Sequence, residues 1–213
     1  MFDMDGTILN TLADLAHATQ LTLAKHQLTD TTLAEVRRDV GNGARVLFER
    51  LCKTRRCFSD ELVDTLLHDF RICYEAHHND NTKPYEGVPD MLAQCKKDGW
   101  KLAVLSNKPH DDVCALADLH FSGLFTVAEG ASDAFLLKPH PEHVEHIMHM
   151  LHATPQTCVY IGDSEVDVQT AHNAQVHGVF VDWGYRSREE LTRAGASKIA
   201  SSPAMLYQFI TQI

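Results

Sequence analysis

Acidic residues follow two separate apolar runs of the sequence, and their spacing suits chemistry at a bound cation. Asp3 and Asp5 come directly after the first apolar residues and are followed by a glycine. Gly6 permits a tight turn, so the second carboxylate can swing over the crevice that the first one faces. Asp163 and Asp167 follow a later apolar run at positions i and i+4, where Asp167 can support Asp163 from the next helical turn.

Four carboxylates that converge on one crevice repel one another unless a cation lies among them. Oxygen-only ligands suit Mg²⁺ better than zinc, so the sequence predicts a magnesium site. A phosphoryl group brought there would also need hydrogen-bonding and cationic partners, which Ser106 at a strand end and Lys138 could supply. Pro139 restricts the backbone beside Lys138, just before a helix expected near Pro141, so this lysine is held in place.

Short apolar runs that end abruptly in polar residues predict the buried strands that carry these side chains. Amphipathic stretches separate the runs. The expected strands cover residues 1–4, 101–105, 123–128, 158–161 and 178–181, and the expected helices between them cover residues 88–97, 111–119 and 141–151. This alternation predicts a doubly wound parallel α/β sheet with a ligand crevice at the carboxyl ends of its strands.

The stretch from residue 11 to residue 81 breaks this alternation because it holds helical patterns only. Four helices are expected there, over residues 12–25, 31–38, 44–52 and 60–74. Helices inserted after the first strand predict a helical cap domain. We therefore expect residues 1–11 and 82–213 to form an α/β catalytic core and residues 12–81 to form the cap.

Composition and charge limit the partners of the chain. The formal net charge of -10 argues against a nucleic acid or an anionic membrane as the main partner, because both repel an acidic surface. No apolar stretch has the length of a membrane span, and acids stand at the start where a signal peptide needs positive charge. The six cysteines form no Cys-x-x-Cys pair, which fits reduced thiols. We expect a cytoplasmic protein in which an anionic substrate would need local cationic partners.

Four histidines recur at every third position from His143 to His152. Because histidine is a common metal ligand, this repeat could indicate a metal site. A spacing of three drifts around a helix, whereas the apolar residues between Val144 and Leu151 follow the helical core pattern. We therefore expect these histidines to form a solvated helix face.

Four motifs in order along the chain resemble those of the haloacid dehalogenase superfamily, within its phosphoglycolate phosphatase-like group. They are residues 3–7 (DMDGT), 105–108 (LSNK), 138–139 (KP) and 162–167 (GDSEVD), with further similarity at residues 85–88 (YEGV) and 183–185 (WGY). The resemblance covers essentially the whole chain. It implies a phosphoric monoester hydrolase with a Rossmann-like core and an inserted cap.

The resemblance also implies the roles of the acids. Asp3 would be the nucleophile that forms an aspartyl phosphate, and Asp5 the general acid and base. Asp3, the backbone carbonyl of Asp5 and Asp163 would bind Mg²⁺, with Asp167 in support. Only Met1 and Phe2 precede the nucleophile, so we expect the natural chain to begin several residues earlier.

The remaining expected site residues contact the substrate. The resemblance implies that Ser106 and Lys138 hold phosphoryl oxygens, assisted by backbone N–H groups near Gly6 and Asn107. Arg45, which follows a Gly-Asn-Gly turn in the expected cap, is a candidate contact to the end of the substrate away from phosphate.

Phosphoglycolate is the leading substrate on overall resemblance, and other activities stay open. A β-phosphoglucomutase-type sugar-phosphate mutase and an inorganic pyrophosphatase would use the same motifs. A haloacid dehalogenase or a phosphonate hydrolase is disfavoured because Asp5 is present. A catalytically silent binding or regulatory relative usually lacks a catalytic residue, and none is missing here.

Overall fold

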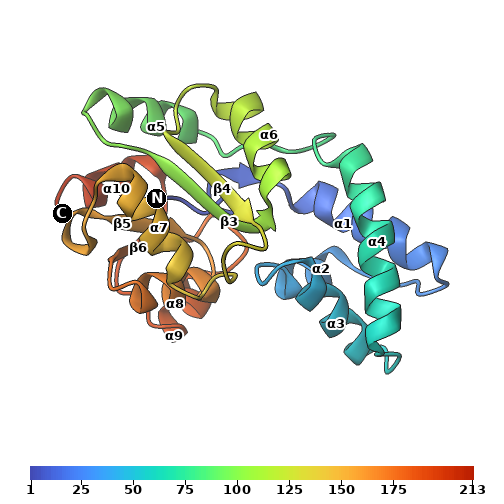
Figure 1. The fold of residues 1–213 in the computed structure, drawn as a ribbon. Coiled ribbons are helices and arrows are strands. Elements are labelled where there is room, and N and C mark those ends of the chain that lie inside the picture. Colours follow the sequence, from blue (N-terminus) through green and yellow to red (C-terminus); the bar gives the residue numbers. More distant parts are fainter. The chain divides into compact units, whose positions relative to one another are not determined.

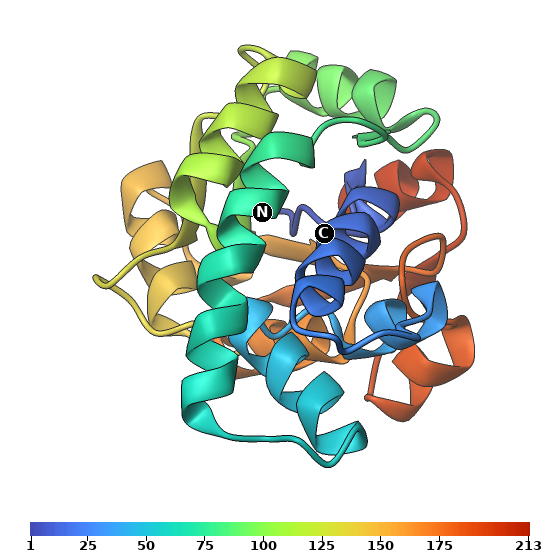
Figure 2. The same cartoon turned by 90° about the vertical axis from the view of Figure 1, so that its right-hand side faces the viewer.

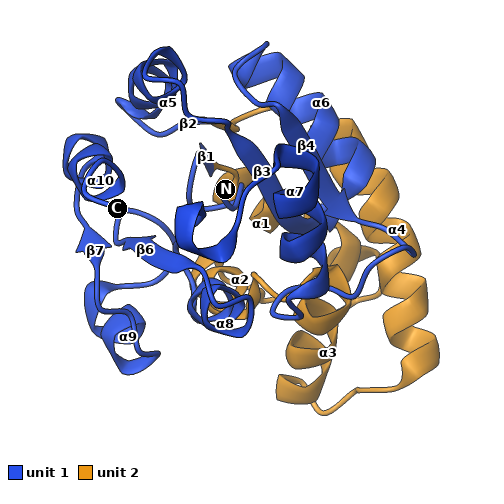
Figure 3. Cartoon of the chain, turned by 60° about the vertical axis from the view of Figure 1, so that its left-hand side comes forward, with its two compact units in different colours: residues 1–9, 84–213 blue, residues 10–83 orange.

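The computed structural model describes all 213 residues and divides into two compact units (Figure 3). Unit 1 comprises Met1–Leu9 and Pro84–Ile213, and unit 2 comprises Asn10–Lys83. The short strands β1 (Leu9–Asn10) and β2 (Lys83–Pro84) pair with each other where the chain passes between the units.

Unit 1 is built on parallel strands, as the sequence predicts. The strands are β3 (Ala103–Pro109), β4 (Val127–Ala131), β5 (Val159–Gly162), β6 (His177–Val181) and β7 (Ile199–Ala200). β3 pairs with β4, and β6 lies between β5 and β7, with all pairs parallel.

Phe2 connects these two sets of strands. It forms parallel bridges to Val104 in β3 and to Ile161 in β5. Its N–H donates to the carbonyl of Ala103 (2.8 Å), and the N–H of Asp3 donates to the carbonyl of Ile161 (2.8 Å). Isolated bridges therefore stand where a strand over residues 1–4 was expected, and they place Asp3 at the centre of the sheet.

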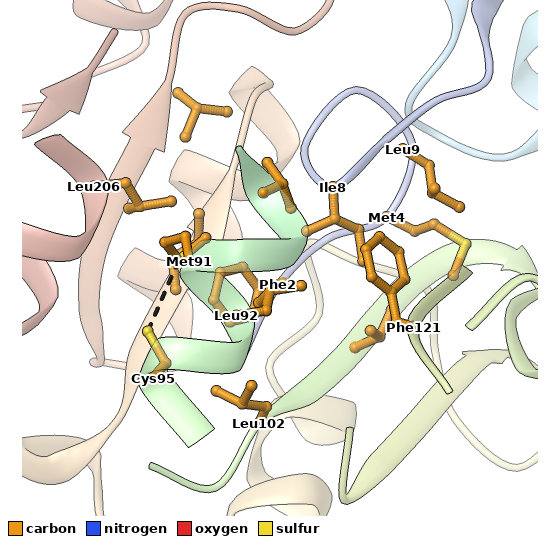
Figure 4. Packing of buried hydrophobic residues seen from close by; sticks show 14 of the residues in the cluster. Phe2, Met4, Ile8, Leu9, Met91, Leu92, Cys95, Leu102, Phe121 and Leu206 are labelled. Atoms are coloured by element: carbon orange, nitrogen blue, oxygen red, sulfur yellow. Dashed lines mark hydrogen bonds between the residues drawn. The ribbon is translucent and has the colours of Figure 1, made fainter. Parts of the chain in front are cut away.

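Helices cover both faces of this sheet. They are α5 (Val88–Lys97), α6 (His110–Phe121), α7 (Glu142–Leu151), α8 (Glu165–Asn173), α9 (Arg188–Arg193) and α10 (Pro203–Ile210), with a 3₁₀ turn at Pro155–Thr157. Side chains of α5, α6 and α10 pack with Phe2 and Val104 (Figure 4). Those of α7, α8 and α9 pack with Ala103 and Leu105, the strand neighbours of Val104 that point to the opposite face. The doubly wound α/β architecture is thus confirmed for unit 1.

Unit 2 contains helices only, apart from its share of the β1–β2 pair. They are α1 (Leu12–Lys25), α2 (Leu33–Asp39), α3 (Ala44–Thr54) and α4 (Asp60–His77), and α1 lies beside α4 (Figures 1 and 2). The unit has its own hydrophobic core, in which the rings of Phe48 and Phe70 pack edge to face with their centroids 5.3 Å apart. Thr32 and Ser59 cap α2 and α4 by accepting hydrogen bonds from backbone N–H groups of the first turns.

Two smaller expectations can be compared with the structure. His143 is buried on α7 and its Nε2 lies 2.5 Å from Glu129 Oε2, so the expected solvated histidine face is wrong at this position. The six cysteines are all unpaired. None of the helices combines the length and the apolar composition that crossing a bilayer requires.

Candidate active site

Asp3 directly follows Phe2, the residue that bridges β3 and β5, and its side chain is buried next to Lys138. Lys138 Nζ lies 2.8 Å from Asp3 Oδ1. Oδ1 is buried, and the ammonium group of Lys138 is the charged group that approaches it, as an ion pair. The fold therefore presents a carboxylate oxygen with free acceptor capacity beside a fixed positive charge.

Asp3, Asp163 and Asp167 form a buried cluster in which one oxygen of each lies within 4.8 Å of the others. Burial raises the pKa of Asp3 from 3.8 to about 7, Lys138 opposes this rise, and Asp167 adds to it. Burial and the neighbouring Asp167 also hold the pKa of Asp163 well above its usual value. An additional cation would relieve this repulsion, and the oxygen-only donor set fits a hard divalent ion such as Mg²⁺.

Asp163 follows β5 directly, and two neighbours fix its carboxylate. Thr7 Oγ1 donates a hydrogen bond to its Oδ1 (2.8 Å), and the N–H of Tyr185 donates to its Oδ2 (2.7 Å). Each oxygen keeps acceptor capacity for a metal. Gly6 has a φ of +85°, and a Cβ at this position would collide with the Asp163 carboxylate. Sequence reasoning gave Thr7 and Tyr185 no role, although both lie within the motifs that carry the resemblance.

Asp167, in the first turn of α8, already has its carboxylate fully engaged. Oδ1 accepts from Lys138 Nζ (2.9 Å) and Tyr160 OH (3.1 Å). Oδ2 accepts from the N–H of Asp163 (3.2 Å) and from both the N–H (3.1 Å) and the hydroxyl (2.6 Å) of Ser164. A carboxylate offers about four acceptor sites, so Asp167 suits a supporting role better than direct coordination.

Lys138 lies in the loop between β4 and α7, and its side chain is 2% exposed. Asn107 in β3 holds its backbone, since Asn107 Oδ1 accepts from the Lys138 N–H (2.8 Å) and Nδ2 donates to the Lys138 carbonyl (3.0 Å). Burial would lower the pKa of Lys138, but Asp167 and Asp3 outweigh it and raise that pKa well above its usual value. Lys138 is therefore a permanent cation in the site.

Asp5 forms an ion pair with Lys108, a residue to which the sequence motifs alone assigned no role. Lys108 Nζ lies 3.2 Å and 3.1 Å from the two carboxylate oxygens of Asp5. Lys108 is buried at the end of β3, two positions after Ser106. Its place directly after a strand-end serine and asparagine is the signal in the sequence that could have drawn attention to it.

Of the other expected substrate contacts, Ser106 and Gly6 lie in unit 1 and Arg45 lies in unit 2. Ser106 is buried and its Oγ accepts from the N–H of Lys108 (3.3 Å). The N–H of Gly6 donates to the Leu9 carbonyl (2.9 Å), so Gly6 shapes the turn after Asp3. Arg45 lies on α3 in unit 2, exposed and paired with Asp64 of α4.

Asp3, Asp163, Asp167 and Lys138 thus lie together at the carboxyl ends of the parallel strands of unit 1. The sequence matches the haloacid dehalogenase-like hydrolase family over residues 1–181, and the chain belongs to this family.

Individual relatives agree with this family assignment. The chain is 34% identical over 203 residues to a phosphoglycolate phosphatase of Caulobacter vibrioides, covering 94% of this chain and 85% of that one. It is 31% identical over 194 residues to a phosphoglycolate phosphatase of Mesorhizobium japonicum, covering 88% and 84%. A crystal structure from Lactobacillus delbrueckii subsp. bulgaricus, whose proposed activity is phosphoglycolate phosphatase, superposes with a TM-score of 0.94 at 32% identity, covering 98% and 96%. The expected enzyme class, a phosphoric monoester hydrolase, is confirmed by these relatives.

Proposed function

We propose that the chain is a Mg²⁺-dependent phosphatase that hydrolyses a small phosphorylated metabolite through an aspartyl phosphate on Asp3, with 2-phosphoglycolate as the leading substrate. The observation that carries this proposal is the ion pair between Asp3 and Lys138, next to the carboxylate of Asp163. This arrangement supports the proposal because the candidate nucleophile, a cation and the candidate metal ligands lie close together in a buried position. The substrate itself is suggested by the phosphoglycolate phosphatases among the relatives.

In the proposed reaction a carboxylate oxygen of Asp3 attacks phosphorus, and the bond from phosphorus to the leaving oxygen breaks. Lys138 and Ser106 hold the phosphoryl oxygens and offset the repulsion between two anions. Asp5 donates a proton to the leaving oxygen, then takes one from the water that hydrolyses the acyl phosphate. Inorganic phosphate leaves and the Asp3 carboxylate is restored.

Asp3, Asp163 and the backbone carbonyl of Asp5 would hold the metal, with Asp167 fixing the backbone and the lysine around them. Bound Mg²⁺ would supply positive charge beside the attacking carboxylate and the phosphoryl group. The remaining acceptor capacity of the Asp3 and Asp163 carboxylates supports this assignment.

We propose two roles for unit 2. One is that residues 12–81 act as a cap domain that sets specificity. The other is that Arg45 contacts the part of the substrate away from phosphate. Arg45→Ala should then change KM for some phosphate esters and leave others unaffected, and a uniform response across substrates would count against it.

The function is tested by phosphate release from a panel of compounds with Mg²⁺ present. The panel holds 2-phosphoglycolate, glucose 1-phosphate, β-glucose 1-phosphate and pyrophosphate, and isomerisation to glucose 6-phosphate is followed in parallel. Acid-quenched protein is digested and analysed by mass spectrometry for a phosphoryl group on the peptide that contains Asp3. Dominant pyrophosphate hydrolysis or mutase activity would replace the proposed substrate, and a phosphoryl group on another residue would overturn the mechanism.

A further inference from the structure

The ammonium group of Lys138 is surrounded by three buried oxygen acceptors. Its Nζ donates to Tyr160 OH (2.9 Å) and to Asp167 Oδ1 (2.9 Å). Its third close approach is the ion pair with Asp3 Oδ1 (2.8 Å). An ammonium carries three N–H groups. Two of them engage Tyr160 and Asp167, so the third is directed at Asp3, the proposed nucleophile.

Tyr160 is an uncharged member of this group of acceptors. It is completely buried in β5, and its hydroxyl accepts from Lys138 while donating to Asp167 (3.1 Å). Burial raises the pKa of the Tyr160 hydroxyl well above its usual value, so the hydroxyl is neutral. It orients the ammonium without adding a negative charge to a cluster that already holds three buried carboxylates.

Asn107 fixes the other end of the same residue. Its carboxamide bonds both the N–H and the carbonyl of Lys138, and all of these groups are buried. The two residues are 31 positions apart, so this contact ties the end of β3 to the loop before α7. Lys138 is consequently held at its backbone by Asn107 and at its ammonium group by Tyr160 and Asp167.

We infer that Tyr160 and Asn107 are positioning residues that hold the ammonium group of Lys138 beside Asp3, where it would meet the transferred phosphoryl group. This inference rests on the proposed function, because it needs a phosphoryl group at that point. Both residues act through Lys138. The transition state carries charge on the phosphoryl oxygens, and a misaligned donor stabilises it less.

The sharpest test is Tyr160→Phe, which keeps the ring in the core and removes only the hydroxyl. We expect kcat for the best phosphate ester to fall about 10- to 100-fold, as for loss of a hydrogen bond to a charged group, with little change in KM. Thr170→Val is the matched control. It also removes a buried hydroxyl, which bonds only to the Val166 carbonyl of its own helix, and should keep the wild-type kcat.

A double-mutant cycle tests whether both residues act through the same lysine. Asn107→Ala should also lower kcat, and the double variant should lose less than the product of the two single losses. Independent, multiplicative losses would show that Asn107 and Tyr160 do not share Lys138 as their target.

The melting temperature of each variant separates positioning from stability. A Tyr160→Phe protein with a lower melting temperature and the wild-type kcat would show that the hydroxyl only stabilises the core, and would overturn the inference. If the wild type hydrolyses no phosphate ester, the proposed function fails. Calorimetric titration with inorganic phosphate, Mg²⁺ present, then decides the inference: weaker binding in Tyr160→Phe than in Thr170→Val supports it, and equal binding refutes it.

Discussion

Asp14, in the first turn of α1, accepts hydrogen bonds from the backbone N–H of Asn81, 67 positions later in the chain. The same buried carboxylate accepts from Asn81 Nδ2 (2.9 Å) and from both the N–H and the hydroxyl of Thr82 (2.8 Å each). One side chain thus joins the first helix of unit 2 to the segment that leaves the unit.

Asp14→Ala should lower the free energy of unfolding by about 3 kcal/mol, because it leaves the buried N–H and hydroxyl of Thr82 without an acceptor and removes the hydrogen bonds from Asn81. Denaturant unfolding followed by circular dichroism measures this change. Asp60→Ala, at an exposed position in the first turn of α4, is the matched control and should cost less than about 1 kcal/mol. Equal losses of unfolding free energy in the two variants would show that the Asp14 hydrogen bonds stabilise the fold no more than an exposed aspartate in the first turn of a helix does.

The stabilisation from Asp14 should depend on pH. Burial alone would raise the pKa of its carboxyl, but the hydrogen bonds from Asn81 and Thr82 outweigh burial and hold that pKa below 3.8. A carboxyl group with a depressed pKa in the folded state stabilises fully above its unfolded pKa. The difference in unfolding free energy between wild type and Asp14→Asn should therefore be constant above about pH 5 and shrink as the pH falls through the folded pKa. A difference that is the same at low and neutral pH would contradict this assignment.

Asp3→Asn should abolish turnover and leave the fold intact, because an amide is nearly isosteric with the carboxylate but is not a useful nucleophile. Burial raises the pKa of Asp3 from 3.8 to about 7, so ionisation of Asp3 lowers the stability of the metal-free folded protein progressively between these two pH values and fully above the higher one. The variant should therefore melt at the same or a higher temperature at pH 8. Substantial activity in preparations free of wild-type protein would rule out Asp3 as the nucleophile.

Asp5→Asn should keep the nucleophile and lose proton transfer, with a fall in kcat of about 10² to 10⁴-fold. The effect should be smallest for esters with a good leaving group, which need no proton, so a comparison of p-nitrophenyl phosphate with an alkyl phosphate is the measurement. A variant equally impaired on both esters would indicate that Asp5 acts in another way, for example through its ion pair with Lys108.

Removal of divalent metal should abolish activity, and Mg²⁺ should restore it while Ca²⁺ does not. The larger ion accepts more ligands and would disturb the alignment of Asp3 with phosphorus. Mg²⁺ should also raise the melting temperature of the wild type more than that of Asp163→Asn, since binding to the folded state stabilises it. Full activity after exhaustive chelation would refute the metal requirement.

Local patterns in the sequence predicted helices where α1 to α7 lie, whereas α9 and α10 were not predicted. The expected helices over residues 12–25 and 88–97 agree with α1 and α5 at both ends, because the apolar periodicity and the bounding Gly87 and Thr11 are local features. Strand boundaries were less predictable. Expected strands over residues 101–105 and 123–128 became β3 (Ala103–Pro109) and β4 (Val127–Ala131), since a strand extends only where a neighbour pairs with it.

The sequence by itself also indicated which residues form the candidate site, because carboxylates and strand-end serine, asparagine and lysine can be recognised by type and spacing. Only the tertiary structure decided how these groups are held. Asn107 reaches the backbone of Lys138, Thr7 reaches Asp163 across 156 positions, and Tyr160 completes the hydrogen bonds of the lysine. Such partners have no fixed spacing in the chain, because packing of the parallel strands brings their carboxyl ends together irrespective of sequence separation.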